Sequence, residues 1–342
     1  REQGVAVDVF RLRHQDGVSY HEFKDINVTT GAQSSLRTML ASGQYKHVLV
    51  HFLDADMWEV LGEFIDDVRV TVWVHGSEIQ PWGRRKFNFI TEDALEKAKV
   101  QSKERLVFWR SLLEQMPKNL ELVFVSNFLA KETMEDLKLR IPDSQYHIIH
   151  NPIDTELFCF SEKNVEQRKK ILSIRPYASR VYANDLSVKA VLELSNKQFF
   201  DELEFHFVGD GPLFVETLEP LRNFSNVKIE KRFLTQEEIA DYHRRYGIFL
   251  CPTRSDTQGV SRDEAMSSGL VPITNAVAAI PEFVDDKSAL LADAEDYVGI
   301  ANSIIFLFEN PSVFMEMSSE SRLNVMSDRE ASLVIDKELK LF

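Results

Sequence analysis

Two acidic residues and a glycine lie at short spacing in the stretch 252–282, which reads PTRSDTQGVSRDEAMSSGLVPITNAVAAIPE. Asp256 and Glu264 are separated by seven residues, and Gly259 lies between them. We expect Gly259 to end a loop and a helix to begin directly after it. The first N–H groups of a helix have no partner inside the helix, so they favour a phosphate. Glycine lets that phosphate approach the backbone closely. The candidate pyrophosphate site therefore consists of the backbone of Gly259, Val260 and Ser261.

The two carboxylates of this stretch could hold the rest of a nucleotide-linked sugar. Glu264 lies one turn into the expected helix, where it can reach a ribose diol. Asp256 lies on the loop, where it can reach sugar hydroxyls. The alternative is a solvated acidic loop followed by a helix that starts with ordinary polar residues. Each residue considered alone favours that alternative, so the functional interpretation depends on the whole stretch.

The stretch begins at the carboxyl end of an expected strand, residues 248–251. Open α/β sheets bind their ligands at that edge. Strands and helices alternate through the second half of the chain, which indicates a parallel sheet covered by helices on both faces. The other strands expected there are residues 171–174, 204–208, 227–230 and 271–274.

The first half of the chain shows the same alternation of strands and helices. A helix is expected from about residue 56, and a long one over residues 91–116. Thr91 is a suitable N-cap for the long helix, because Glu92 and Asp93 follow it in the positive first turn. The strands expected in this half are residues 47–52, 68–74 and 122–125.

This alternation predicts an α/β protein with two doubly wound domains. Residues 1–150 form the first domain and residues 151–325 the second, while 326–342 form a helical tail that could pack back on the first domain. Residues 4–10 (GVAVDVF) look like a second strand without a first strand before them. We therefore expect the natural protein to extend further at its N-terminus.

Composition narrows the class of protein. Of the 342 residues, 44% are hydrophobic and 27% are charged, which is typical of a soluble globular protein. The formal net charge of −14 argues against non-specific binding of nucleic acid. The apolar runs are too short to cross a bilayer, and the chain does not open like a signal peptide. Cys159 and Cys251 are too few for a disulfide framework, so a cytoplasmic location is expected.

The stretch 252–282 resembles the signature of the retaining glycosyltransferases of family 4, which have the GT-B fold of two Rossmann-like domains. That signature is Glu-x-x-Gly-x-x-x-x-Glu-Ala-Met, followed by a Gly, a Pro-Val/Ile strand and Ile-Pro-Glu. The one departure is Asp256, where the family usually has Glu, so the charge is kept but the reach is shorter. The matching positions are Asp256, Gly259, Glu264, Ala265, Met266, Gly269, Pro272, Ile280, Pro281 and Glu282.

Shorter segments also resemble this family, and together they cover roughly residues 120–325. Residues 150–154 (HNPID) resemble its entry into the second domain, and 208–212 (VGDGP) resemble its turn at Gly209. Before residue 118 only 75–78 (HGSE) matches, where the resemblance implies that His75 and Gly76 approach the donor sugar and phosphate. The alternative for His75 is a turn with a satisfied imidazole.

The family usually places an Arg and a Lys after the first strand of the second domain. The available cations here are Arg175 and Arg180, and either can clamp phosphate oxygens with its guanidinium. Which of the two contacts the phosphate stays open, and a surface arginine is the alternative for each. Phe233 matches the family position whose backbone commonly recognises the base of the nucleotide. The sequence contains no Asp-x-Asp motif, and His147 and His150 would point to opposite faces of a strand.

The resemblance implies a metal-independent, retaining sugar transfer of the kind found in bacterial polysaccharide or glycan synthesis. No cofactor is expected; a UDP- or GDP-linked sugar is the co-substrate, and the acceptor is a glycan or a lipid-linked glycan. Association with the inner face of a membrane is compatible with such an acceptor. The catalytic candidates are His75, Asp256, Arg175 and Arg180, and the donor-binding candidates are Gly76, Gly209, Phe233, Gly259, Val260, Ser261 and Glu264.

Two other functions fit the same fold. A nucleotide-sugar 2-epimerase would need acid–base carboxylates and a histidine, but the spacing of Asp256 and Glu264 fits the transferases better. A non-catalytic nucleotide-sugar-binding module is suggested by Asp256 in place of Glu and by the absent first strand. The sequence names neither the base, the sugar, the acceptor nor the oligomeric state.

Overall fold

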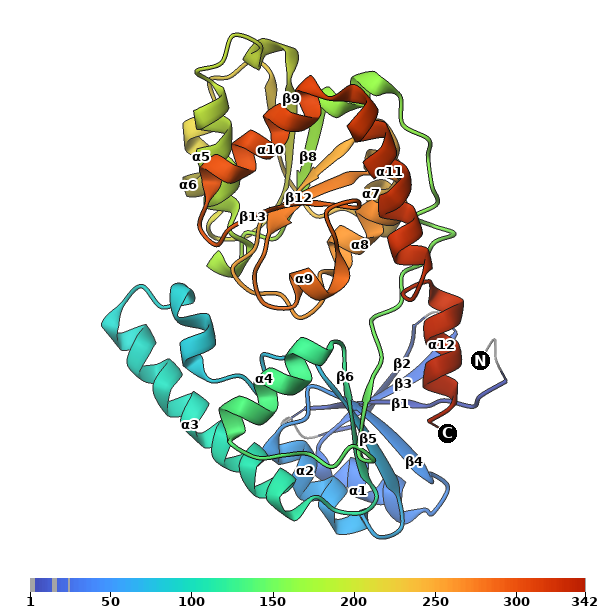
Figure 1. Cartoon of the computed structure of the whole chain (residues 1–342). Helices are drawn as coiled ribbons and strands as arrows, with labels where there is room; N and C mark the ends of the chain where they lie inside the picture. The colour runs from blue at the N-terminus through green and yellow to red at the C-terminus, as the bar shows by residue number, and fades with distance from the viewer. Residues whose placement is uncertain (1–3, 14–16, 24, 342) are drawn as a thin grey trace. The chain divides into compact units, whose positions relative to one another are not determined.

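The computed structural model describes residues 4–13, 17–23 and 25–341. The residues form two compact units, each with many contacts inside itself (Figure 1). The first unit consists of Arg1–Pro81, Lys99–Phe124 and Glu132–Ile148, and the second of Trp82–Ala98, Val125–Lys131 and Ile149–Phe342.

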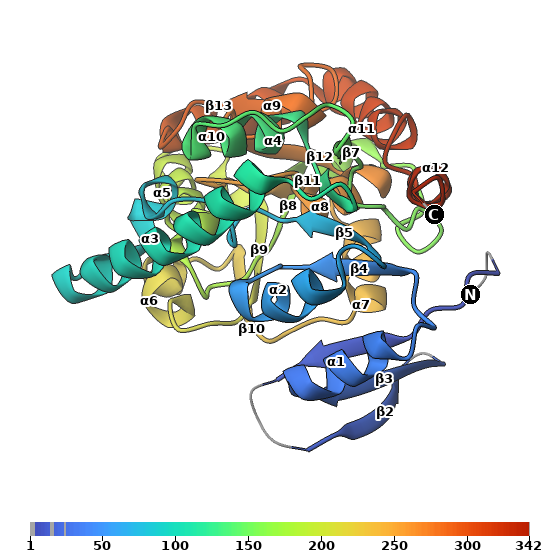
Figure 2. The ribbon, with the colours of Figure 1, turned by 90° about the horizontal axis from the view of Figure 1, so that it is seen from below.

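A four-stranded parallel sheet lies at the centre of the first unit. Its strands follow the order β4-β5-β6-β7, and β4 and β5 lie side by side (Figure 2). Val70, Val72 and Val74 in β5 are fully buried, as expected for a strand that is covered on both faces. The strands are β4 (His47–His51), β5 (Arg69–Val74), β6 (Leu120–Phe124) and β7 (Tyr146–Ile148).

Helices follow the strands of this sheet along the chain, and their starts obey local rules. Asp54 caps one helix by accepting a hydrogen bond from Met57 N at 2.8 Å. The predicted N-cap Thr91 is confirmed, because its Oγ1 accepts from Ala94 N at 3.2 Å. These helices are α2 (Ala55–Leu61), α3 (Glu92–Gln115) and α4 (Asn127–Leu137).

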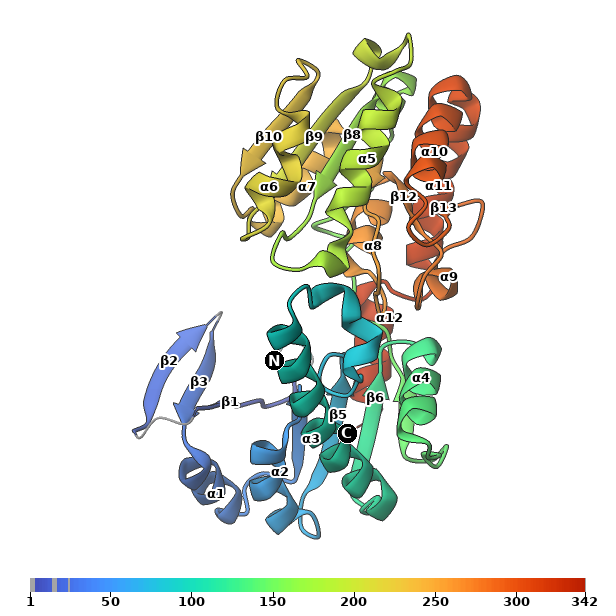
Figure 3. The ribbon, with the colours of Figure 1, turned by 90° about the vertical axis from the view of Figure 1, so that its left-hand side faces the viewer.

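A second, three-stranded sheet precedes this one in the chain, in the order β1-β3-β2 (Figure 3). β1 (Val9–Leu12) overlaps the end of the strand expected at residues 4–10. The antiparallel hairpin of β2 (Ser19–Phe23) and β3 (Ile26–Gly31) was not predicted. Every residue of β2 is exposed, so its sequence carries no alternation of apolar and polar residues. The helix α1 (Gln33–Ala41) follows this sheet.

The second unit contains a six-stranded parallel sheet in the order β10-β9-β8-β11-β12-β13. Chain order runs outwards in both directions from the neighbouring pair β8 and β11, so this pair marks the switch point of the sheet. The strands are β8 (Lys170–Ile174), β9 (Glu204–Gly209), β10 (Val227–Lys231), β11 (Ile248–Leu250), β12 (Val271–Asn275) and β13 (Leu290–Ala292).

Alternate residues of these strands enter two apolar clusters on opposite faces of the sheet. Ile171 and Ile248 pack with residues of α5, α6 and α10, and their neighbours Leu172 and Phe249 pack with α7 and α8. The helices are α5 (Asn184–Leu194), α6 (Phe214–Leu218), α7 (Gln236–Arg245), α8 (Val260–Ser267), α9 (Ile280–Phe283), α10 (Tyr297–Glu309), α11 (Pro311–Met326) and α12 (Ala331–Leu339).

Each strand predicted between residues 47 and 274 forms, with ends that agree within two residues. The short strands β7 and β13 were not predicted. In the described part of the chain, no single helix is long and apolar enough to cross a membrane. The helices α10 and α11 reach the required length and composition only as a pair, which is bent by 108°.

Candidate functional site

The candidate site begins with an arginine that follows β8. Arg175 is only 5% exposed, and its Nη1 donates a hydrogen bond to Ser261 Oγ at 2.9 Å. Its guanidinium carbon lies 5.0 Å from the centre of the Tyr182 ring, so the aromatic face helps to hold it. Arg175 Nε is buried and has no hydrogen-bond partner among the described residues. Because β8 pairs with β11, this arginine reaches the helix that follows β11.

The turn at the start of α8 has the geometry expected from the sequence. Gly259 is the N-cap and has a φ of 100°, a left-handed conformation that disfavours other residues. The helix begins at Val260, as predicted. Within the described part of the chain, the N–H groups of Gly259, Val260 and Ser261 donate to no backbone or side-chain acceptor. These groups and Arg175 form one positively polarised surface, which is suited to an anion.

Glu264 lies one turn into α8 with a mostly buried carboxyl group. Burial, and to a lesser extent the neighbouring Asp263 carboxylate, raises its pKa to about 7. No hydrogen bond to its carboxyl oxygens occurs among the described residues. A half-ionised carboxyl without a partner can accept hydrogen bonds from a diol or donate them to it. Its role at a ribose stays a prediction.

Asp256, the departure from the family pattern, is held inside the loop that precedes α8. Its Oδ1 accepts a hydrogen bond from Gln258 N at 3.2 Å, and its backbone carbonyl accepts from Ala279 N at 3.1 Å. This arrangement fixes the start of the loop and still leaves Oδ2 of the carboxylate for another partner. Its contact with a sugar stays a prediction.

The predicted donor-binding glycine Gly209 has a clear packing role. A Cβ at this position would lie 2.0 Å from the carbonyl oxygen of Arg175 and 2.9 Å from the Tyr177 ring. A Cβ at Gly211, which has a φ of +144°, would lie 2.3 Å from the backbone of Tyr177. The glycine turn after β9 therefore lets the Arg175 loop pack directly against it, and so helps to place the guanidinium.

Two other predicted residues of the second unit are less constrained. Arg180 lies in the 3-10 helix Arg180–Tyr182, and its guanidinium forms no hydrogen bond or ion pair among the described residues. Phe233 follows β10 and is 76% exposed. Their contacts with phosphate and base stay predictions.

In the first unit, His75 follows β5 as expected and belongs to a cluster of rings. Its Nε2 lies 2.9 Å from Nδ1 of His51, which ends β4, and it stacks on Phe52 at 4.3 Å. Burial lowers the pKa of both imidazoles, and the nearby His75 lowers the pKa of His51 further. Gly76 next to it has a φ of 115°. The sequence analysis missed His51. It could have been found, because His51 ends the strand that precedes β5, and neighbouring parallel strands end at the same edge of a sheet.

The two histidines considered as a metal pair have separate partners. His147 Nε2 lies 3.3 Å from Glu121 Oε2, and His150 Nδ1 lies 2.7 Å from the carbonyl oxygen of Val125. Among the described residues, no group of three or more metal-binding side chains converges on one point.

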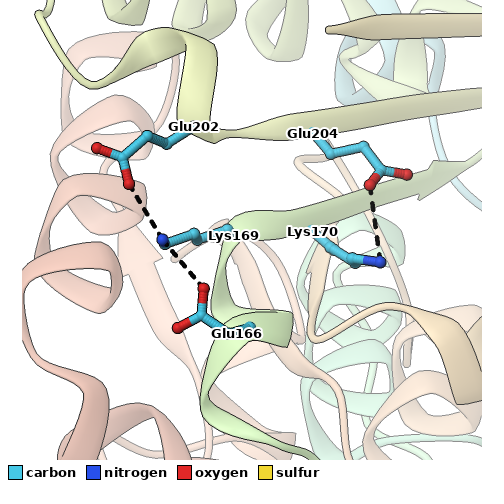
Figure 4. A pocket seen from close by; sticks show the side chains of 5 residues that line it. All are labelled: Glu166, Lys169, Lys170, Glu202 and Glu204. Atoms are coloured by element: carbon cyan, nitrogen blue, oxygen red, sulfur yellow. Dashed lines mark hydrogen bonds and ion pairs between the residues drawn. The ribbon is translucent and has the colours of Figure 1, made fainter.

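A surface pocket lies elsewhere, at the amino ends of β8 and β9 (Figure 4). Lys169 lies 3.0 Å from both Glu166 and Glu202, and Lys170 lies 3.8 Å from Glu204. Both lysines of this pocket are paired with glutamates, and ligands of open α/β sheets bind at the opposite, carboxyl edge. The pocket is therefore separate from the candidate site.

The comparison with protein families matches residues 168–310, which include β8, β11 and α8, to the family described as glycosyl transferases group 1. This segment is therefore similar to the glycosyl transferases group 1. The match contains Arg175, Gly209, Phe233 and the whole stretch from Asp256 to Glu264.

The chain is also similar to curated proteins at low identity. The chain is 24% identical over 225 residues to N-acetyl-alpha-D-glucosaminyl L-malate synthase of Bacillus anthracis, covering 62% of this chain and 56% of that protein. Matches to other curated relatives cover 36% and 40% of their length. The chain thus spans about half or less of the curated relatives that it matches.

Solved structures show the same fold. Sucrose-phosphate synthase from Thermosynechococcus elongatus superposes with a TM-score of 0.75 at 14% identity, over 99% of this chain and 89% of that one. The pneumococcal O-GlcNAc transferase GtfA, solved with UDP and GlcNAc, has a TM-score of 0.66 at 18% identity, over 94% and 62%. The chain therefore has the GT-B fold that the sequence led us to expect.

The close packing at Gly209 predicts a large effect of adding one methyl group. Gly209→Ala should lower the free energy of unfolding by about 1–3 kcal/mol, because the new Cβ would displace the Arg175 backbone. The control is Gly83→Ala, where a Cβ would meet no atom within 4 Å, and where a change below about 0.5 kcal/mol is expected. Chemical denaturation measures both values, and equal stabilities would contradict the packing role.

The raised pKa of Glu264 predicts pH-dependent binding of a nucleotide sugar. As the pH rises from 6 to 8 through the pKa of about 7, the carboxyl ionises and becomes a stronger acceptor for a diol. Affinity should rise over this range in the parent chain and stay flat in Glu264→Gln. A nucleotide sugar is the right probe, because a nucleoside diphosphate has a terminal phosphate that itself titrates at about pH 6. The same slope in both proteins in calorimetric titrations would refute the role of Glu264.

Proposed function

We propose that this protein is a glycosyltransferase that takes a sugar from a UDP- or GDP-linked donor and transfers it to a hydroxyl of a glycan or lipid-linked glycan. The observation that carries this proposal is the hydrogen bond from Arg175 to Ser261 at the N-terminus of α8. Through the Ser261 hydroxyl it keeps a buried guanidinium close to the backbone N–H groups at the start of α8. Both kinds of donor favour a diphosphate. The similarity to the glycosyl transferases group 1, and the likeness to a transferase solved with UDP and GlcNAc, support the same function.

Each part of the donor has a candidate partner in the second unit. The diphosphate would bind the N–H groups of Gly259, Val260 and Ser261 together with Arg175, and Arg180 would add a second cation. The ribose would contact Glu264, and the base would contact the backbone near Phe233. The transferred sugar would contact Asp256, while His75 and Gly76 are candidates from the first unit.

The proposed chemistry retains the anomeric configuration. The bond between the anomeric carbon and the diphosphate oxygen breaks while the acceptor oxygen forms its bond on the same face of the sugar. The proton of the acceptor hydroxyl passes to the departing diphosphate, so no protein nucleophile is required. The protein would stabilise the charge that grows on the leaving group, and the hydrogen bond of Arg175 to Ser261 at the start of α8 supports this role for its guanidinium.

Metal independence is part of the proposal because of this charge arrangement. A divalent ion would otherwise neutralise the diphosphate, and here the guanidinium of Arg175 and the start of α8 offer positive charge at the same place. A cytoplasmic location, with a membrane-bound acceptor as one option, is likewise an expectation that follows from the sequence.

Binding without metal is the first test. We expect a nucleoside diphosphate to bind in excess EDTA, and Arg175→Met to weaken this binding by about 10- to 100-fold, as for the loss of a charge-assisted hydrogen bond of about 1.5–3 kcal/mol. The exposed Arg222, which pairs with Glu219 at 2.9 Å, provides the control Arg222→Gln, which should bind normally. Isothermal titration calorimetry is the measurement. Binding that vanishes in EDTA and returns with magnesium or manganese would rule out metal independence.

Asp256 tests whether the site acts on a sugar. Asp256→Asn should leave the affinity for the free nucleoside diphosphate within about twofold, but lower turnover of the nucleotide sugar about 10- to 1000-fold, since one polar contact to the reacting sugar is lost. Release of nucleoside diphosphate is measured with and without acceptor glycans. Asp256→Glu, which restores the family residue, should change the preferred donor or abolish transfer.

The same assay separates the alternatives. Conversion of the free donor into another sugar nucleotide without any acceptor would identify an epimerase, and binding without turnover would identify a binding module. If both Asp256 variants transfer sugar at the parent's rate with the same donor preference, Asp256 is an ordinary loop residue.

A further inference from the structure

Four polar side chains of the second unit are almost completely buried directly behind the Gly259 turn. Gln258 is 1% exposed, Arg262 is 2%, Asp263 is 0% and Arg329 is 2%. Charged side chains are seldom buried to this extent unless they are paired. No local sequence pattern predicts this group, because Arg262 and Asp263 look like ordinary polar residues at the start of a helix.

Asp263 lies at the centre of this group. Its Oδ1 accepts hydrogen bonds from Arg262 Nε at 3.1 Å and Nη2 at 2.7 Å. Its Oδ2 accepts from Gln258 Nε2 at 3.2 Å and lies 3.8 Å from Arg329 Nε. One carboxylate therefore holds three side chains, one of which comes from a distant part of the chain.

The group connects the turn to two other segments. The side-chain amide of Gln258 accepts from Asn151 N at 2.6 Å and donates to Asn151 O at 3.1 Å. Two residues later, Ile153 N donates to the carbonyl oxygen of Arg329 at 2.8 Å, and Ile153 O accepts from Ala331 N at 3.0 Å. Arg329 is itself fixed, because its Nη1 donates to Phe283 O at 3.0 Å.

The same contacts determine which way the peptide groups of the turn point. The carbonyl of Gln258 accepts from Arg262 Nη2 at 2.7 Å, and the carbonyl of Gly259 accepts from the backbone N of Arg262 and Asp263 at 3.0 and 3.1 Å. In a planar trans peptide the N–H points opposite to the C=O. Holding these two carbonyls inwards therefore turns the N–H groups of Gly259 and Val260 outwards.

Stability alone is a poor explanation for this group. Burying charges has a large desolvation cost, and apolar residues of similar volume often replace buried ion pairs with no loss of stability. A fixed orientation of the N–H groups explains the buried charges better, because donors that are already oriented bind an anion without reorganisation.

We propose that Gln258, Asp263 and Arg329 are positioning residues, which hold the Gly259 turn with its N–H groups preset for the diphosphate of the donor. This inference rests on the proposed function, because it requires a diphosphate at α8. It adds that the affinity for diphosphate depends on Arg329, although this residue lies far along the chain from the Gly259 turn.

The test uses the full chain and Gln258→Met, which keeps the side-chain volume but removes the three hydrogen bonds of the amide. Gln167 is a matched control: it is also buried, donates to Arg244 O at 3.0 Å and accepts from Asn164 N at 2.9 Å, away from the turn. UDP and GDP are titrated calorimetrically in parallel with thermal unfolding, at a temperature where each variant is folded. Gln258→Met should weaken diphosphate binding at least tenfold, and Gln167→Met should change it less than twofold at a similar loss of Tm.

Arg329 provides the second pair of variants. Arg329→Met should weaken diphosphate binding like Gln258→Met, and Arg329→Lys, which keeps the charge, should recover part of the affinity. If Gln258→Met does not fold, the Arg329 pair decides by the same measure. A parent chain that binds UDP or GDP, together with variants that lose Tm but bind equally well, would overturn this inference alone. A parent chain that binds neither nucleotide would overturn the proposed function and this inference with it.

Discussion

The parallel pairing of β8 with β11 is the constraint on which the rest of the site depends. The chain leaves β8 towards one side of the sheet and β11 towards the other, so their carboxyl ends diverge and leave a place for a ligand between two loops. One loop brings the buried guanidinium of Arg175, and the other brings the N-terminus of α8. The candidate anion site needs both loops, and the sheet order makes them neighbours.

Close backbone packing turns this topology into defined geometry. Gly209, which ends β9, and Gly211 have no Cβ, so the Arg175 loop can lie against them. On the other side, the positive φ of Gly259 and the buried Asp263 fix the start of α8. The raised pKa of Glu264 belongs to the same arrangement, because the burial that shapes the turn also disfavours its charged form. Electrostatics and packing at this site therefore have a common origin.

The three-stranded sheet and the ring cluster of the first unit follow different rules. The exposed β2 is held by its hairpin to β3 and not by an apolar face. The imidazoles of His51 and His75 meet because β4 and β5 pair in parallel with their carboxyl ends together. In both units, polar side chains come together where the carboxyl ends of neighbouring parallel strands meet. The residues found there differ between the two sheets.

The sequence by itself determined the strands with continuous apolar runs, such as β5 and β11, and the helix starts at Thr91 and Val260. Local sterics, capping and burial decide these elements within a few residues of chain. It also determined the stretch from Asp256 to Glu264, because a glycine before a helix is a local signal. Only the tertiary structure decided that Arg175 contacts Ser261, that Asp263 joins Gln258 to Arg329, and that His51 meets His75. These contacts join residues far apart in the chain, and they depend on strand order and burial, which no local pattern of residues encodes.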